Sequence, residues 1–155
     1  MKPYTVAIDI DVPRARVIEL FDNPDNLFCW QDGLQSFDHV SGEPGQPGAS
    51  STLVYMKGKH RIVLTEEVTK NNLPDEFNGS YSWAGGKNTL VNRFIELGPG
   101  KTRWESTCTY TLKGLIPRLM GTLVPGVFRS QNQRFLENFK AFCEDGADVR
   151  KESKT

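Results

Sequence analysis

The sequence predicts an α+β fold in which a curved antiparallel sheet wraps around one long C-terminal helix. Two observations support this prediction. Between residues 34 and 112, short β-type segments alternate with glycine- and proline-rich turns. Only residues 114–145 have apolar side chains at the spacing of a long helix, and that apolar face is strongly aromatic. Such a face needs a broad partner surface, which a sheet can supply.

The composition is that of one ordinary domain without a strong overall charge. Nineteen Lys and Arg balance nineteen Asp and Glu in 155 residues, so the formal net charge is zero and we expect no nucleic-acid partner. Three scattered cysteines do not suggest a disulfide framework or a zinc site. No apolar run is long enough to span a bilayer. We therefore expect a cytoplasmic protein with no metal, no cofactor and no stable membrane insertion.

A strand and two short helices are predicted at the start of the chain. Apolar and polar residues alternate over 4–10, the period-two pattern of a strand with one buried face. Pro13 is well placed as the first residue of a short helix. Asn23 can cap a second short helix, with Pro24 in its first turn and Trp30 on its apolar side. Both helices are too short to stand alone, so they should pack on the sheet.

Six further strands follow at regular intervals, which indicates an antiparallel meander. The loop 41–48 is too rich in glycine and proline for a regular element, and residues 71–75 read as another connection. Residues 57–59 and 84–87 read as tight turns between neighbouring strands. The predicted strands are 34–40, 51–56, 61–69, 77–83, 89–97 and 103–112.

The last helix carries an aromatic stripe that is interrupted by an amide. Phe128, Asn132, Phe135 and Phe139 follow one another at helical spacing. Either Asn132 or its neighbour Gln131 must then point inward, and an unpaired buried amide costs about 1–3 kcal/mol. We favour Asn132 because it keeps the strict spacing. Its partner would be the sheet, a water or a ligand.

The order of elements, together with several turn residues, resembles the START-like helix-grip superfamily of polyketide cyclases and pollen-allergen-type ligand carriers. The resemblance covers nearly the whole chain and includes the stretches VPRARVIELFDNPDNLFCWQDGLQSFDHVSGEPGQPG and TYTLKGLIPRLMG. It implies one ligand-binding domain, residues 1–145, followed by a polar and flexible tail, 146–155. The single residues that match are Val12, Pro13, Trp30, Gly42, Gly48 and Gly114.

The same resemblance implies a seven-stranded sheet with a cavity between it and the last helix. The residues alone favour a solid core in that space, whereas the resemblance favours a pocket. Pro125 should bend or break the helix. Residues 115–123 would then form a lid over the cavity or pack in the ordinary way. The candidate ligand-binding residues are Trp30, Tyr55, Tyr81, Trp83, Phe94, Trp104, Cys108, Tyr110, Phe128, Gln131, Asn132 and Phe135.

Titratable residues do not converge on a catalytic site in the sequence. His39 and His60 lie near strand ends or turns, where a solvated role is common. Glu66 and Glu67 are adjacent on one strand, so they place one carboxylate on each face and do not form a pair. The catalytic residues are therefore unknown at this stage.

Three functions remain open. We favour the binding or transport of a small hydrophobic or amphipathic molecule such as a lipid, polyketide or isoprenoid, because inward-facing polar groups are few. A polyketide cyclase or dehydratase without metal or nucleotide is the alternative, and an inward carboxyl or His with a perturbed pKa would favour it. A co-chaperone-like interaction module is the third hypothesis. A homodimer is also compatible with the sequence.

Overall fold

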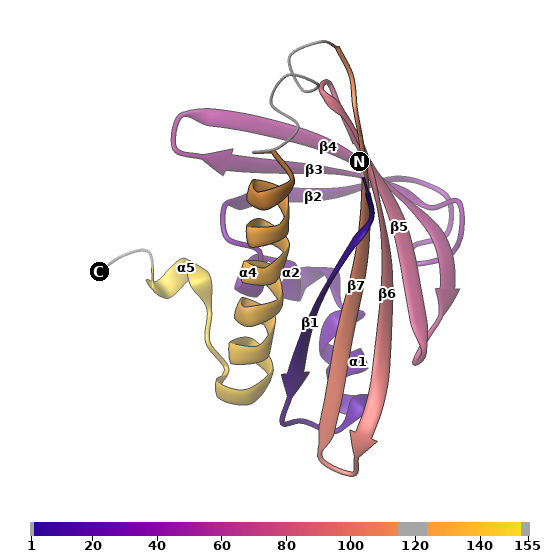
Figure 1. The fold of residues 1–155 in the computed structure, drawn as a ribbon, viewed down its shortest axis with the longest axis vertical. Coiled ribbons are helices and arrows are strands. Elements are labelled where there is room, and N and C mark those ends of the chain that lie inside the picture. Colours follow the sequence, from indigo (N-terminus) through magenta and orange to yellow (C-terminus); the bar gives the residue numbers. More distant parts are fainter. Residues whose placement is uncertain (1, 115–123, 153–155) are drawn as a thin grey trace.

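The computed structural model describes residues 2–114 and 124–152. It confirms the predicted fold: a seven-stranded antiparallel sheet curves around the long helix α4 (Val124–Asp145) (Figure 1). The strand order is β1-β7-β6-β5-β4-β3-β2, so β1 closes one edge by pairing with β7. The strands are β1 (Tyr4–Ile10), β2 (Leu34–Ser41), β3 (Ser50–Lys57), β4 (His60–Asn72), β5 (Glu76–Trp83), β6 (Gly86–Gly98) and β7 (Lys101–Leu112).

Several strands extend beyond their predicted ends because cross-strand pairing continues into the turns. Strand β4 was expected to end at residue 69, but Asn71 and Asn72 pair with β5, so the predicted connection 71–75 is partly wrong. Strand β6 begins at Gly86 instead of Thr89. Gly86 pairs with both neighbouring strands. Local sequence showed where chain direction changes but not how far pairing persists.

The two short helices lie between β1 and β2, as predicted. Helix α1 spans Arg14–Phe21, and Pro13 is its N-cap with an extended ψ of 144°. The expectation that Pro13 is the first helical residue is therefore wrong by one position. The second helix is a 3₁₀ turn, η1 (Pro24–Asn26), followed by the short α2 (Leu27–Trp30). Asn23 caps η1 as expected, because its side chain accepts a hydrogen bond from the Asp25 backbone N–H.

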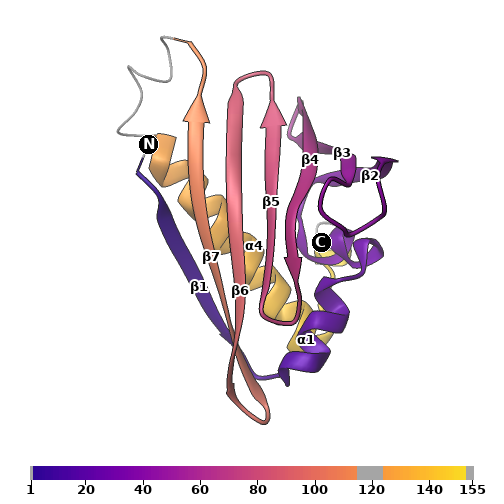
Figure 2. The same cartoon turned by 90° about the vertical axis from the view of Figure 1, so that its right-hand side faces the viewer.

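Helix α4 runs diagonally across the far side of the sheet in Figure 2. It begins at Val124, which places Pro125 in its first turn. The predicted helix and lid over 115–123 lie outside the described residues. Beyond α4, the expected tail contains a short helix, α5 (Val149–Glu152), which contacts α2. The flexibility of that tail remains a prediction.

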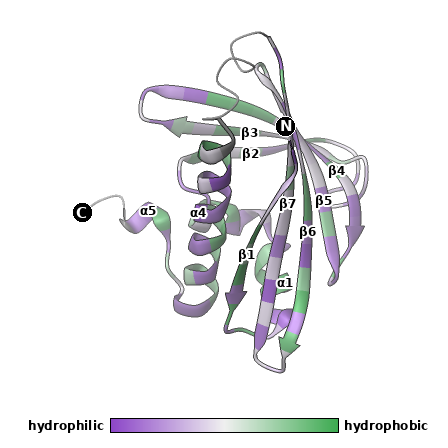
Figure 3. Ribbon diagram, viewed as in Figure 1, coloured by the Kyte–Doolittle hydropathy of each residue, from purple (hydrophilic) through white to green (hydrophobic). Residues whose placement is uncertain are grey.

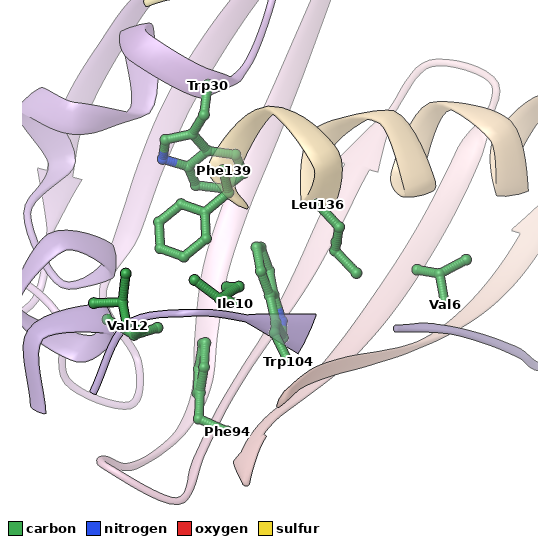
Figure 4. Packing of buried hydrophobic residues seen from close by; sticks show 9 residues of the cluster. Val6, Ile10, Val12, Trp30, Phe94, Trp104, Leu136 and Phe139 are labelled. Atoms are coloured by element: carbon green, nitrogen blue, oxygen red, sulfur yellow. The ribbon is translucent and has the colours of Figure 1, made fainter. Parts of the chain in front are cut away.

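The core lies between α4, α2 and the β1-β7-β6 side of the sheet. Ile10 and Phe139 are fully buried, and Trp30 and Trp104 are nearly so. Figure 4 shows these side chains converging from both layers. Apolar and polar residues are interleaved along α4 and the strands (Figure 3), so each element has one face for this core. None of the helices within the described ranges is long and apolar enough to cross a membrane.

Candidate functional site

A cavity of about 370 Å³ lies between the sheet and α4, beside the packed core. Its volume is within the usual range for small-molecule sites, about 300–1,000 Å³. Strands β2 to β7 contribute to the wall, and α1, α2 and α4 close it from the other side. The aromatic part of the wall consists of Phe21, Trp30, Phe37, Phe77, Tyr81, Trp104 and Phe135.

The mouth of the cavity lies between the start of η1 and the loop that joins β2 to β3. Four residues that line the cavity there are exposed to solvent: Asp22, Pro24, His39 and Pro44. His39 forms a 2.7 Å hydrogen bond between its Nε2 and the Gly42 carbonyl oxygen. Partial burial raises the pKa of the Asp22 carboxyl. The entrance is therefore polar, whereas the interior is mainly aromatic and aliphatic.

One row of polar side chains crosses the concave face of the sheet. Its members are direct partners on consecutive strands, and such pairs lie within side-chain reach of each other. The row starts at the mouth and ends near α4. From β2 to β7 it consists of His39, Ser51, Glu66, Tyr81, Asn88 and Tyr110.

Glu66 is the residue in this row that sequence analysis missed. Its side chain lines the cavity, and burial raises the pKa of its carboxyl. A hydrogen bond with Tyr81 opposes part of that rise. Glu66 forms no ion pair with any described residue. Glu66 and Glu67 place one carboxylate on each face of β4, as predicted, and the inward one, Glu66, faces the cavity although it was not among the predicted ligand-binding residues.

The polar groups near Glu66 differ in whether they have hydrogen-bond partners. The Tyr55 hydroxyl donates a 2.5 Å hydrogen bond to Gln31 Oε1, which ties β3 to the segment after α2. Burial and the nearby Glu66 carboxyl raise the pKa of the Tyr81 hydroxyl. Asn88 is 8% exposed, and its Oδ1 has no hydrogen-bond partner among the described residues. These phenols and amides keep hydrogen-bonding groups close to an otherwise apolar space.

Asn132 is the inward amide of the α4 stripe, as favoured from the spacing. Its Nδ2 lies within hydrogen-bonding distance of the Tyr4 hydroxyl, of Cys108 Sγ at 3.1 Å and of the Tyr110 hydroxyl at 3.2 Å. Burial and a hydrogen bond to Tyr110 raise the pKa of the Tyr4 hydroxyl. The amide therefore joins α4 to β1 and β7 and also contributes to the cavity wall.

The chain can be placed in a family by its sequence. Residues 1–144 match the family model for polyketide cyclase/dehydrase and lipid transport. The chain belongs to this family. None of the curated proteins matches the sequence.

Solved structures show the same fold at low sequence identity. The Zhui aromatase/cyclase from Streptomyces sp. R1128 superposes with a TM-score of 0.79 at 10% identity, covering 92% of this chain and 93% of that one. TTHA0849 from Thermus thermophilus has a TM-score of 0.77 at 17% identity, covering 92% and 97%. A conserved protein from Geobacillus kaustophilus has a TM-score of 0.77 at 14% identity, covering 94% and 97%. The family and these neighbours agree on the fold.

The structure separates the twelve candidate ligand-binding residues into two groups. Five of them line the cavity: Trp30, Tyr81, Trp104, Asn132 and Phe135. Trp30 is held in place because Asn138 of α4 donates a hydrogen bond to its carbonyl oxygen at 3.1 Å.

The other seven candidates lie elsewhere. Phe94 belongs to the packed core, and Gln131 lines a shallow outer depression together with Lys57. The remaining five are not part of the cavity wall: Tyr55, Trp83, Cys108, Tyr110 and Phe128. Tyr110 and Phe128 stack on each other with ring centroids 4.1 Å apart. A ligand role for any of the twelve remains a prediction.

Across residues 2–114 and 124–152, no three His, Cys, Asp or Glu side chains come together in a way that could hold a metal ion. Glu66 can offer hydrogen bonding and proton transfer, and Tyr81 and the amides can offer hydrogen bonds.

Proposed function

We propose that this member of the family binds a small amphipathic molecule in its cavity and acts as a carrier or sensor. The observation that supports this most directly is the cavity itself, about 370 Å³ with aromatic walls and one inward carboxyl group, Glu66. Removing apolar surface from water contributes roughly 25 cal/mol per Å², so a ligand with an aromatic or aliphatic body would gain affinity from such walls. A polar group on the ligand would meet Glu66 and Tyr81.

Unsatisfied polar atoms near the cavity also support ligand binding. Trp30 lines the cavity and is 4% exposed, and its Nε1 has no hydrogen-bond partner among the described residues. A buried donor without a partner costs about 1–3 kcal/mol. A ligand acceptor that reached this indole nitrogen would recover part of that cost.

A cavity-filling substitution tests the proposal. Val68 lines the cavity from β4 and is 4% exposed, so Val68→Phe should place an aromatic ring in the ligand space. Val63 lies on the opposite face of the same strand and is 41% exposed, which makes Val63→Phe the matched control. With naphthylethanol as a neutral aromatic probe, calorimetric titration should show affinity falling by about tenfold or more in Val68→Phe only. The control should bind like the wild type.

Equal binding by wild type and Val68→Phe, in folded proteins with matching circular dichroism, would contradict a ligand site in this cavity. A second experiment addresses the native ligand. Native mass spectrometry of the protein purified from its own cells should detect a retained small molecule in the wild type and less of it in Val68→Phe.

Catalysis of a cyclase or dehydratase type is the second candidate, and one observation favours it. Glu66 is an inward carboxyl whose pKa is raised by burial, and a carboxyl with a raised pKa inside a pocket is a candidate general acid. The family description includes polyketide cyclase/dehydrase activity. If the protein turns over a poly-β-ketone substrate, Glu66→Gln should lower kcat by about 100-fold or more while substrate affinity changes little. Unchanged turnover in Glu66→Gln would exclude this role for Glu66.

A further inference from the structure

We propose that the ligand is an amphipathic amine whose protonated nitrogen pairs with the Glu66 carboxylate. This inference rests on the proposed ligand binding and names its chemical class. It follows from the charges on the cavity wall, from the partners of Glu66 and from the aromatic groups around it.

The charged groups on the wall are acidic or neutral. The described residues that line the cavity include two carboxyl groups, Glu66 in the interior and Asp22 at the mouth, but no Lys or Arg. Among these lining residues, only His39 at the mouth has a side chain that can become cationic. A fatty acid or phosphate ester in this interior would place an anion beside a carboxyl group with no cation to compensate it. The wall therefore disfavours anionic ligands and favours neutral or cationic ones.

Glu66 lacks the counter-charge that a carboxylate lining an apolar cavity needs. Ser51 lies opposite it on β3, and Tyr81 lies opposite it on β5 and forms a hydrogen bond with it. Both neighbours are neutral, and the carboxyl has no ion-pair partner among the described residues. An ammonium group would supply both a positive charge and up to three N–H donors. Its positive charge would favour the ionised form of Glu66.

The remaining wall suits the body of such an amine. Trp30, Trp104 and Phe135 come from three different elements and border the same space as Glu66. Aromatic rings attract a nearby cation through their quadrupole, and they also bury an apolar chain or ring. One acidic group among several aromatic rings is therefore complementary to a single cationic nitrogen carried on an apolar body.

Three matched probes test this inference: naphthylethylamine, naphthylethanol and naphthylacetic acid, titrated into the 155-residue protein at pH 7 by calorimetry. The three share one aromatic body and differ in the charge of the end group. We expect the amine to bind more tightly than the alcohol by about tenfold or more, because a hydrogen bond between charged groups is stronger than one between neutral groups. The acid should bind more weakly than the alcohol.

Glu66→Gln keeps the shape of the side chain and should reduce the difference between amine and alcohol to about twofold or less. The alcohol should bind this variant about as well as the wild type. Glu67→Gln removes the same charge from the exposed face of β4 and is the matched control, so it should keep the full preference for the amine.

The outcomes separate this inference from the function on which it rests. If the alcohol binds but the amine is no tighter, or if the amine preference persists in Glu66→Gln, the ligand class is wrong while the binding site stands. Tightest binding by the acid would also overturn the inference. If none of the three probes binds, the proposed function fails and the inference fails with it.

Discussion

The two halves of the sheet differ in how closely they approach helix α4. On one side residues of β1, β7 and β6 share a packed core with α4, and Ile10 and Phe139 are fully buried there. On the other side β2 to β5 stand apart from α4 and line the cavity together with parts of β6 and β7, and Phe37 and Glu66 are only half-buried there. The first half therefore supplies the packed core, and the second half supplies the cavity in which we propose that a ligand binds.

The packed half is held by rings in edge-to-face and stacked contact. Trp104 lies 5.1 Å from Phe139 and 5.6 Å from Phe94, measured between ring centroids. Such pairs add about 0.5–1.5 kcal/mol to the stability that burial provides. The cavity half lacks this density because its side chains face open space, so changes there should affect binding more than folding.

The largest expected effect is the loss of an aromatic ring from the packed half. Phe139→Ala should lower the free energy of unfolding by about 3–5 kcal/mol, because it leaves a void in a fully buried site. Phe37→Ala in the cavity half should cost at most about 1–2 kcal/mol, because that ring is half exposed and borders a void already. Urea denaturation of both variants measures the difference. Equal losses would refute the division between the halves.

A smaller effect is expected at Asn132, which lies between the halves. Asn132→Leu removes the amide hydrogen bonds to Tyr4 and Tyr110 and should cost about 1–3 kcal/mol with the fold retained. Gln131→Leu changes the neighbouring amide, which lines the outer depression, and should change stability by less than about 0.5 kcal/mol. Comparable denaturation midpoints for the two variants would show that the buried network adds nothing to stability.

The smallest expected effect is a pH dependence that originates from Glu66. Because burial raises its folded-state pKa above the ordinary value of 4.5, the folded protein binds more protons than the unfolded one between the two pKa values. Stability from this group is therefore complete below about pH 4.5 and is lost as the pH rises through the folded pKa. Glu66→Gln has no carboxyl to ionise, so this loss of stability should be absent. The free energy of unfolding of the variant, relative to that of the wild type, should therefore rise with pH.

Urea midpoints measured from pH 4 to pH 8 for both proteins give this difference directly. The other groups near the cavity with shifted pKa values, Asp22, Tyr55 and Tyr81, are present in both proteins, so their contributions largely cancel. A difference that stays constant with pH would mean that Glu66 has an unperturbed carboxyl in the folded state.

Much of the fold could be predicted from the sequence because its signals are local. Alternation over 4–10 and the glycine-rich turns marked the strands, and the spacing of Phe128, Asn132 and Phe135 marked the helix face. The division between core and cavity could not be predicted. Phe94 and Trp104 are cross-strand partners with similar burial, yet only Trp104 lines the cavity. That distinction depends on sheet curvature, which is not encoded locally.

Glu66 was missed although a signal for it exists. Ile62, Leu64 and Val68 form one apolar face of β4, and Glu66 is the only charged residue that interrupts it, whereas Glu67 falls on the polar face. A single carboxyl on an apolar strand face is as informative as the single amide on the helical stripe. Because the two glutamates do not form a pair, neither was predicted as a site residue, although only one of them lies on the apolar face.

The placement of Trp30 and Trp104 has an optical consequence. Their rings meet edge to face with centroids 5.7 Å apart, and both border the cavity and the packed core at once. Their intrinsic fluorescence should therefore respond to ligand occupancy and to unfolding through the same pair of rings. The third tryptophan, Trp83, lies away from the cavity wall, against Tyr110 and Phe128. Substituting Trp83 with Phe leaves a protein whose tryptophan emission comes only from the boundary between the packed half and the cavity half.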